Sequence, residues 1–500
     1  MGPRQPGGAG TSKRSSLAAI GVLMAVTLAA SACGNKQGAN GVTKSGGTSA
    51  SKVYQAEAAV TGPVTTGHVI EPLSAHALAL ASNGYTEQEF FVSGTAHAFD
   101  ATSSPRNGRW SIAPTTSAAY QTRILVRRPT DPAHFNGTVV VEWMNVSSGE
   151  SAPDWDYLNP MLMRDGYAYV AVSAQSLGVD GGTPILGSAT GGSNGGLIGA
   201  EPARYGTLHH PGDQYAMDMF AQIGNALRTP KGPVLGGLRP RHVVATGESQ
   251  SAFYLTTFAD ALQPLTGTFD GIFIHSRGGT GAPLSGSSIT SNQGVAGLQI
   301  RTDLSVPVFM FETQTDLIQL GYAAARQPNT SRIRTWEVAG TSHADQYLVG
   351  AAASLLGCTT PVNDGPQHEV VQAAFAAFHT WVDNGTPPAE PAPFRLTGAN
   401  PAALALDSHG NVIGGVRTPA VDVPVSTLSG AAPAGASVLC ALFGSTTLFS
   451  NATLVGLYRN PSNFVASYQA SLDTAIKGGF ILQADRAGLL AQAQQLQFPA

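Results

Sequence analysis

The sequence has 500 residues and a formal net charge of −4, from 27 basic and 31 acidic side chains. This slightly acidic balance argues against nucleic acid as a partner. The chain is longer than an average domain, yet it shows no second Gly/Ser-rich linker between its early tether and its C-terminus, which favours one large domain.

The N-terminus has the pattern of an export signal over residues 1–32. Three basic side chains precede an apolar run of 14 residues, and small residues follow it. As a helix this run would rise about 21 Å, short of the roughly 30 Å hydrocarbon core, which argues against a membrane span. Its end, LAASACG, is similar to a bacterial lipoprotein processing site with Cys33 as the lipidated residue. Ala30 stands where Leu is commoner, so plain secretion remains the alternative.

Cleavage of this signal would remove three basic and no acidic side chains. The mature chain would then have 24 basic and 31 acidic side chains, a formal net charge of −7. Residues 33–52 are rich in Gly and Ser and lack aromatic side chains, so we expect a flexible tether between lipid and domain. Residues 53–500 are then the folded domain. A C-terminal extension from about residue 392 is expected to pack on it, because its helices carry apolar stripes.

Two cysteines remain in the mature domain, Cys358 and Cys440. An even pair in an exported protein predicts a disulfide between them, with two separate buried thiols as the alternative. No metal site is expected, because the cysteines form no CxxC pair and the histidines are scattered.

From residue 121 onward, short β-rich runs alternate with helical patterns. The expected strands are 121–129, 137–146, 166–174, 241–247, 269–276, 306–312 and 331–340. Helices with apolar residues at three-and-four spacing are expected at 215–227, 251–262, 317–326 and 367–383, and another after Asn460-Pro461. Residues 404–416 predict a hairpin. Alternating strands and helices predict an α/β fold with a mostly parallel central sheet flanked by helices.

The stretch VVATGESQSAFYL, residues 243–255, passes from a strand through small residues into a helix. Gly247 lies two residues before Ser249, and Ser251 lies two residues after it. Small residues at these positions allow a tight strand-to-helix turn that exposes the central hydroxyl. The pattern is G-x-S-x-S rather than G-x-S-x-G. Alone it could be a serine helix cap, but the order Ser, acid, His along the chain favours a nucleophile.

His343, in VAGTSHAD beyond an expected strand, is the predicted base, and His209, His210 and His275 are the competing histidines. The acid that orients it is predicted to be Asp316, in the turn after 306–312, with Glu312 as the alternative. One oxyanion donor should be the backbone N–H of Gln250, and the second is sought at Asn145 or Val146.

Two Gly/Ser-rich loops, 175–200 and 276–305, follow strand ends and are candidate pocket walls or merely mobile surface loops. Arg277 and Arg301 could meet a substrate carboxylate, although salt bridges with Asp303 or Asp270 are the simpler expectation. Other side chains expected near the pocket are Glu248, His210, His275, Arg277 and Glu312.

Several stretches, among them TRILVRRPTDPAHFNGTVVVEWMNVSSG, VVATGESQSAFYL and ARQPNTSRIRTWEVAGTSHAD, resemble a largely uncharacterised bacterial family of α/β-hydrolase domain proteins. The resemblance extends from about residue 55 to the end. It implies the α/β-hydrolase fold, with loop insertions and the C-terminal extension, and a serine-hydrolase site in which Ser249 matches the G-E-S-Q-S nucleophile and His343 the G-T-x-H base. It implies no particular substrate.

The sequence thus predicts an exported serine hydrolase of the cell envelope, anchored to the membrane through Cys33, that cleaves a small-molecule carboxylic ester. Ser249 would attack, His343 would move the proton, Asp316 would orient His343, and water would complete the reaction. No cofactor is implied. An amidase or peptidase with the same triad, and a non-catalytic binding lipoprotein with a hydrolase fold, remain the alternatives.

Overall fold

A nine-stranded sheet runs through the described part of the computed structural model, which comprises residues 58–76, 79–187, 195–291, 294–398, 402–431 and 435–499. The expected export signal, tether and Cys33 lie outside these residues. The strands are β1 (Ala59–Thr61), β2 (Tyr85–Ser103), β3 (Ser111–Pro129), β4 (Thr138–Trp143), β5 (Ala168–Val172), β6 (His242–Glu248), β7 (Gly271–His275), β8 (Val308–Glu312) and β9 (Ile333–Glu337).

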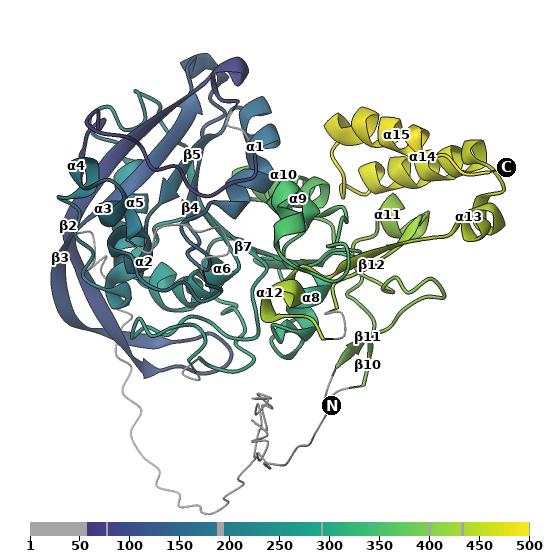
Figure 1. The fold of residues 1–500 in the computed structure, drawn as a ribbon. Helices are drawn as coiled ribbons and strands as arrows, with labels where there is room; N and C mark the ends of the chain where they lie inside the picture. The colour runs from purple at the N-terminus through teal and green to yellow at the C-terminus, as the bar shows by residue number, and fades with distance from the viewer. Residues whose placement is uncertain are drawn as a thin grey trace, which may run out of the picture. The chain divides into compact units, whose positions relative to one another are not determined.

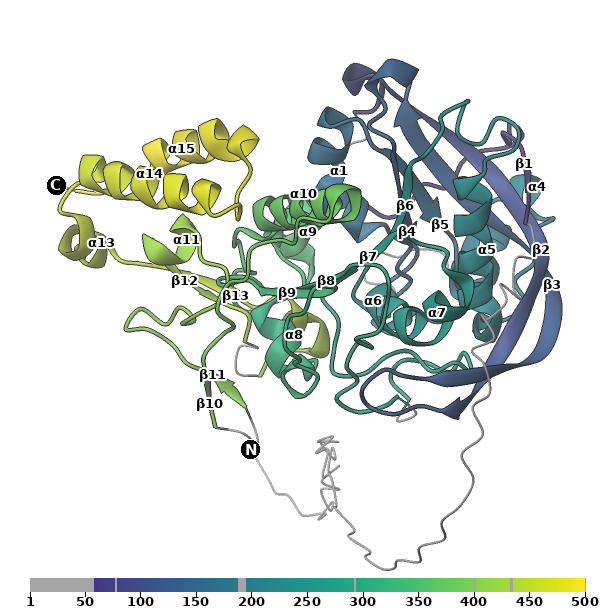
Figure 2. The same ribbon diagram turned by 180° about the vertical axis from the view of Figure 1, so that it is seen from behind.

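The strand order is β1-β2-β3-β5-β4-β6-β7-β8-β9. The six strands from β5 to β9 in this order pair in parallel, whereas β1, β2 and β3 add an antiparallel edge. Figure 2 shows β7, β8 and β9 side by side. The mostly parallel sheet expected from the sequence is confirmed.

Helices cover both faces of this sheet (Figures 1 and 2). The main ones are α1 (Pro153–Arg164), α5 (Ala216–Arg228), α6 (Gln250–Thr257) and α10 (Gln367–Asn384). On β4, Val139 and Val141 pack in the cluster that includes α5 and α6, while Val140 packs in the cluster that includes α1 and α10. Burial on both faces explains why the parallel strands are almost continuously apolar.

Strand order reverses at β4, which pairs with β5 on one side and β6 on the other. The carboxyl ends of β4 and β6 therefore lie next to one another with connections leading away in opposite directions. Such a switch point in an open parallel sheet is where ligands bind. The loops that begin at Asn145 and Ser249 both start here.

One expected helix needs correction, and part of the sheet was not expected from the sequence. The helix expected over 317–326 is broken: α8 (Gln314–Ile318) ends early, and a single 3-10 turn follows at Tyr322–Ala324. Gly321 between them has φ 75°, a left-handed conformation that ends a helix. The edge strands β1 and β2 and the first half of β3 were not expected at all.

The C-terminal extension packs on the sheet domain. Val416 bridges Val338 beyond β9, and the Phe480 ring lies 5.0 Å from that of Trp336. The extension contains β10 (Leu396–Thr397), β11 (Ala403–Leu404), α11 (Pro419–Asp422), β12 (Ser426–Ser429), α12 (Val438–Leu442), β13 (Ser445–Leu448), α13 (Asn451–Tyr458), α14 (Pro461–Lys477) and α15 (Arg486–Gln495). Helix α14 begins as expected, with the Asn460 side chain accepting a hydrogen bond from the Asn463 N–H.

Other local expectations are also met in part. Helix α10 ends at Asn384, one residue beyond the expected end, and Gly385 follows as a left-handed C-cap with φ 80°. The 404–416 hairpin is reduced to one antiparallel bridge between Leu406 and Val412.

Within the described residues, none of the helices combines the length and apolarity that a membrane crossing requires.

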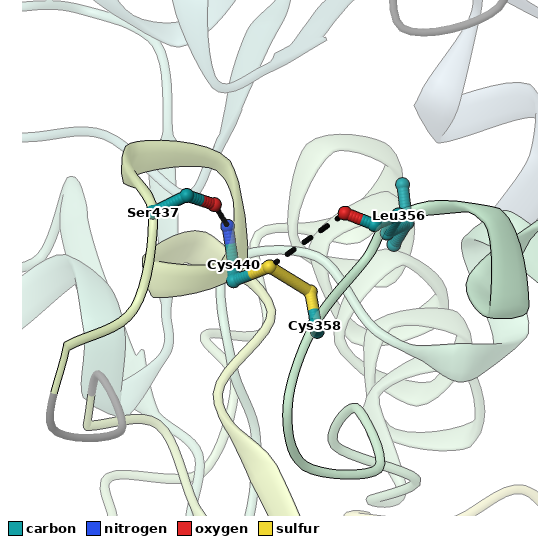
Figure 3. The surroundings of a disulfide bond; sticks show 4 residues. All are labelled: Leu356, Cys358, Ser437 and Cys440. Atoms are coloured by element: carbon teal, nitrogen blue, oxygen red, sulfur yellow. Dashed lines mark hydrogen bonds between the residues drawn. A yellow bond between two sulfur atoms is a disulfide. The ribbon is translucent and has the colours of Figure 1, made fainter. Parts of the chain in front are cut away.

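Cys358 and Cys440 form a disulfide, with their Cα atoms 5.5 Å apart (Figure 3). Cys440 lies in α12, and its backbone N–H donates to the Ser437 hydroxyl that caps this short helix. Cys358 follows α9 (Gln346–Val349) and the 3-10 segment Gly350–Leu355. The bridge therefore ties the C-terminal extension to the chain that comes after His343.

Candidate active site

Ser249 occupies the turn between β6 and α6. Its backbone has φ 57° and ψ −119°, a conformation that costs a non-glycine residue about 1–3 kcal/mol and clusters at functional sites. A Cβ atom added to Gly247 would lie 2.9 Å from Ser251 Cβ, so only glycine fits where the helix approaches the strand. The side chain of Ser249 is half-buried and therefore reachable.

The departure from G-x-S-x-G is accommodated at Ser251. This residue is fully buried and lies at the contact between α6 and β6. Serine is small enough for that contact, which explains how the tight turn forms without the second glycine.

Three side chains from three different strand ends meet at this turn. Ser249 Oγ lies 2.7 Å from His343 Nε2, and His343 Nδ1 lies 2.6 Å from Asp316 Oδ1. An ionised Asp316 can only accept a hydrogen bond, so Nδ1 carries the proton and Nε2 is left to accept the proton of the serine hydroxyl. The geometry brings together the three residues that the sequence singled out.

Asp316 is completely buried, yet it is held in its ionised form. Burial, the largest single cause, raises its pKa, but the interaction with His343 and the hydrogen bonds from Thr313 act together in the opposite direction, and the pKa lies below its usual range. The second oxygen, Oδ2, accepts from the Thr313 N–H at 2.7 Å and the Thr313 hydroxyl at 2.8 Å. Both carboxylate oxygens are thus satisfied.

Glu312, the alternative acid, is placed differently. It ends β8, is completely buried, and neither carboxyl oxygen has a hydrogen-bond partner among the described residues. Burial raises its pKa well above the usual range, and the nearby charge of Asp316 acts in the same direction. A neutral carboxyl without contact to His343 cannot orient that imidazole.

The candidate oxyanion donors lie where β4 and β6 end. Gln250 is the first residue of α6, and backbone N–H groups in a first turn have no partner inside the helix. The Val146 N–H donates to the side-chain oxygen Oε1 of the same Gln250 at 3.1 Å. Asn145 is excluded as a backbone donor, because its N–H bonds to the Ser151 carbonyl at 2.9 Å.

Glu248, next to the nucleophile candidate, lines the same cavity as Ser249 and His343. Its Oε1 lies 3.6 Å from His343 Nε2, and Asn145 Nδ2 donates to Oε2 at 3.4 Å. Burial first, and then the surrounding carboxylates of Asp154, Asp316 and Glu142, raise its pKa well above the usual range. The side chain therefore carries a proton at pH values where a free glutamate is ionised.

Glu248→Gln is expected to stabilise the protein, and to do so more at pH 8 than at pH 5. The native state keeps a proton on Glu248 that the unfolded chain releases above about pH 4.3, so this group makes the fold less stable as pH rises from there toward the raised pKa. Gln needs no proton, so the variant should gain free energy of unfolding relative to the natural protein, by up to about 1.4 kcal/mol per pH unit in that window. Thermal unfolding at pH 5 and pH 8 measures this. An equal difference at both pH values would mean that Glu248 is ionised in the native state.

The other expected pocket residues lie elsewhere. His275 is fully buried, with Nδ1 2.7 Å from Asp154 Oδ1 and Nε2 without a partner among the described residues. His210 bonds to the Ala174 carbonyl at 3.0 Å, and Arg277 is fully buried against the Leu298 carbonyl. With Glu312, these side chains are not among those that line the cavity, because all four are enclosed in the protein interior.

The two Gly/Ser-rich loops contribute less than expected. From the described part of 175–200 only Leu186 lines the cavity, and from 276–305 none of the described residues does. Arg301 bonds to Asp303 at 2.7 Å, which is the salt bridge anticipated from the sequence. The cavity itself has a volume of about 160 Å³.

Its walls come instead from the loop that contains the candidate oxyanion residues Asn145 and Val146 and from two helices that were not singled out. They are the loop after β4, α9 and α12, with Ser147, Ser148, Leu348, Val349, Leu439 and Leu442 among the lining residues. Thr313 was also missed, although the sequence Thr-Gln-Thr-Asp at 313–316 is a variant of the capping-box pattern that could have indicated it. Among the described residues there is no group of three side chains suited to hold a metal ion.

Comparisons with known proteins place this site in context. Residues 60–491 match a family described as alpha/beta hydrolase domain, whereas no curated protein matches the chain. Similar solved structures include a fungal esterase from Rhizomucor miehei (11% identity, TM-score 0.31, covering 58% of this chain and 85% of that chain). A glucuronoyl esterase from Solibacter usitatus is similar at 11% identity and a TM-score of 0.25, covering 57% of this chain and 85% of that chain. The esterase Est22 is similar at 12% identity and a TM-score of 0.28, covering 49% of this chain and 73% of that chain.

At these low identities and TM-scores, the substrates of those enzymes are not assigned to this chain. The family match is of another kind, since it spans most of the sequence and coincides with the parallel sheet and both of its helical layers. The chain belongs to the alpha/beta hydrolase domain family.

Proposed function

We propose that this protein is an exported serine hydrolase that cleaves carboxylic esters through an acyl-enzyme. The observation that carries the proposal is the continuous chain of hydrogen bonds from Ser249 through His343 to Asp316, in a turn that opens into a cavity. A hydroxyl, an imidazole and a buried carboxylate in this geometry activate a serine for acyl transfer.

In the first step Ser249 Oγ attacks the ester carbonyl carbon while its proton passes to His343 Nε2. Positive charge then develops on the imidazole, and the buried carboxylate of Asp316 stabilises it through the bond to Nδ1. Proton transfer by a positioned histidine contributes about 10²- to 10⁴-fold to the rate.

The negative charge on the former carbonyl oxygen is met by backbone N–H groups. Gln250 supplies one at the N-terminus of α6, where the helix dipole also favours negative charge. Val146 supplies the second after Gln250 Oε1, its present acceptor, gives way to the substrate oxygen. The bond between the Val146 N–H and Gln250 Oε1 supports this pairing, because it shows that the Val146 N–H can reach an oxygen acceptor beside Gln250.

Collapse of the tetrahedral intermediate breaks the bond to the alcohol oxygen, which takes the proton from His343 Nε2. A water molecule then replaces the alcohol, gives its proton to Nε2 and attacks the acyl-enzyme, which releases the acid and restores Ser249. Each proton that leaves a nucleophile is returned to a leaving group, so the cycle needs no cofactor.

The proposal is tested with purified protein lacking residues 1–32 on a panel of short esters and the corresponding amides. Ester hydrolysis that is blocked by a fluorophosphonate supports it. Faster hydrolysis of the amides would instead favour an amidase or peptidase, and no turnover of either would favour a non-catalytic binding protein.

Location is the second part of the proposal. Cys33→Ser removes the thiol that would carry the lipid, so the protein should leave the membrane fraction or accumulate with its signal uncleaved. Fractionation and immunoblotting measure this, with Ala30→Leu as a matched variant that should keep or improve processing. Unchanged membrane attachment of Cys33→Ser would show that another feature holds the protein there.

A further inference from the structure

The cavity at Ser249 has a distinctly apolar side. Five aliphatic side chains line it and are only half-buried: Leu186, Leu348, Val349, Leu439 and Leu442. Apolar surface that stays partly in contact with water favours an apolar binding partner. Four of the five come from α9 and α12, so one wall of the cavity provides most of this surface.

That wall stands on the His343 side of the nucleophile. Ala344 follows His343 directly and lines the cavity, and its backbone N–H donates to the Leu442 carbonyl at 3.1 Å. Ser342, on the other side of His343, donates its hydroxyl to the Phe443 carbonyl at 3.2 Å. The end of α12 is therefore bonded to both neighbours of His343.

The oxyanion donors belong to other segments, the end of β4 and the start of α6. An ester bound for attack has its carbonyl oxygen at those donors and its alcohol oxygen within reach of His343 Nε2, which must protonate it. The group attached to the alcohol oxygen then extends along the histidine side. In this cavity that direction leads to α9 and α12.

We propose that α9 and α12 form the binding wall for the alcohol portion of the substrate, and that the preferred esters carry a compact apolar alcohol. The inference rests on the ester hydrolysis proposed above and specifies its substrate class. The cavity volume of about 160 Å³ sets the size. An apolar cavity of about 150 Å³ takes up benzene, and this cavity must also hold the ester group beside Ser249, so the alcohol has no more than about six carbons.

The disulfide holds this wall together. Cys440 stands in α12 between Leu439 and Leu442, and Cys358 follows the segment that continues from α9 (Figure 3). Cys440 Sγ also lies 3.9 Å from the Leu356 carbonyl. Both parts of the wall are therefore covalently joined, which fixes the width of the alcohol site.

The test uses alkyl acetates from methyl to decyl, with kcat/KM measured by acid release. This parameter reports acylation, during which the alcohol is still bound. In the natural protein kcat/KM should rise about fourfold with each methylene group until the alcohol reaches about six carbons, and then stop rising. Leu439→Ala and Leu442→Ala should move this limit to longer alcohols, and raise the ratio of octyl to methyl acetate about tenfold or more.

Val438→Ala is the matched control. Val438 lies on the same helix, is 78% exposed and does not line the cavity, so its loss should leave the profile unchanged. Val349→Phe tests the wall from the other side, since a larger side chain should shorten the preferred alcohol even if the alanine variants fold poorly. Methyl esters of acids of increasing length form the comparison series and should respond to none of these substitutions.

The inference is overturned if the alcohol profile is the same in all variants, or if the substitutions alter the acid series instead. Replacing both cysteines by serine adds a second readout. It should raise KM for hexyl acetate about tenfold relative to methyl acetate, whereas a purely stabilising bond would leave that ratio unchanged.

Failure of the proposed function looks different. It would appear as absent ester hydrolysis and an unlabelled Ser249 in the natural protein, before any variant is compared. An active, labelled enzyme that ignores changes in α12 would contradict the alcohol wall alone.

Discussion

Ser249→Ala is expected to lower ester hydrolysis by a factor on the order of 10⁶, because it removes the only hydroxyl within hydrogen-bond distance of His343 Nε2 among the described residues. The fold should remain, since alanine keeps the small side chain in the turn. Initial rates on a reactive ester and thermal unfolding of the same preparation measure both effects.

Ser251→Ala provides the matched control. Ser251 is two residues away in the same motif, but it is fully buried and its hydroxyl has no hydrogen-bond partner among the described residues. Its variant should keep the activity. A Ser249→Ala protein that hydrolyses esters at the natural rate, or a Ser251→Ala protein that is folded but inactive, would contradict the assignment.

Asp316→Asn should lower kcat by a factor on the order of 10⁴, the size of effect seen when the orienting acid of a serine-protease triad is replaced in the same way. The amide keeps the shape but removes the charge that stabilises protonated His343. Its NH₂ group can also hold Nδ1 as an acceptor, which leaves the proton on Nε2, where it blocks the uptake of the serine proton.

Glu312→Gln separates the two acids that the sequence left open. Glu312 already carries a neutral carboxyl and makes no hydrogen bond to His343, so its amide variant should retain most of the activity. If Glu312→Gln is inactive while Asp316→Asn turns over at the natural rate, the acid lies at the end of β8 and the scheme above is wrong.

Local signals predicted the centre of the molecule well. The passage from β6 through Ser249 into α6 is encoded in thirteen consecutive residues, VVATGESQSAFYL, where small residues permit the close approach seen at Gly247. The parallel strands were equally clear, because strands buried on both faces are continuously apolar. Asp316 could be chosen by position alone, as a carboxyl in the turn after a strand.

Long-range contacts could not be predicted in this way. The cavity wall in α12 lies nearly one hundred residues beyond His343 in the sequence, and no local pattern tells which distant segment will close over an active site. The burial that keeps Glu248 and Glu312 uncharged is likewise a property of the folded surroundings. His275 and Arg277 looked like pocket residues because they follow a strand end, but neighbouring elements cover them completely.

The antiparallel edge shows a different cause of error. Strand β2 mixes polar and small residues along Tyr85–Ser103, so its periodicity is weak, and its pairing with β3 becomes evident only from the register. In the region of α8 the apolar spacing of 317–326 predicted a helix, but the left-handed turn at Gly321 prevails over that spacing.

The most direct test of the central claim is to treat the folded protein with a fluorophosphonate and to map the adduct by mass spectrometry of its peptides. The account predicts one stoichiometric adduct on Ser249, formed in step with the loss of ester hydrolysis, and strongly slowed in Asp316→Asn. An adduct on another residue, or full hydrolysis by protein that carries the adduct on Ser249, would contradict it.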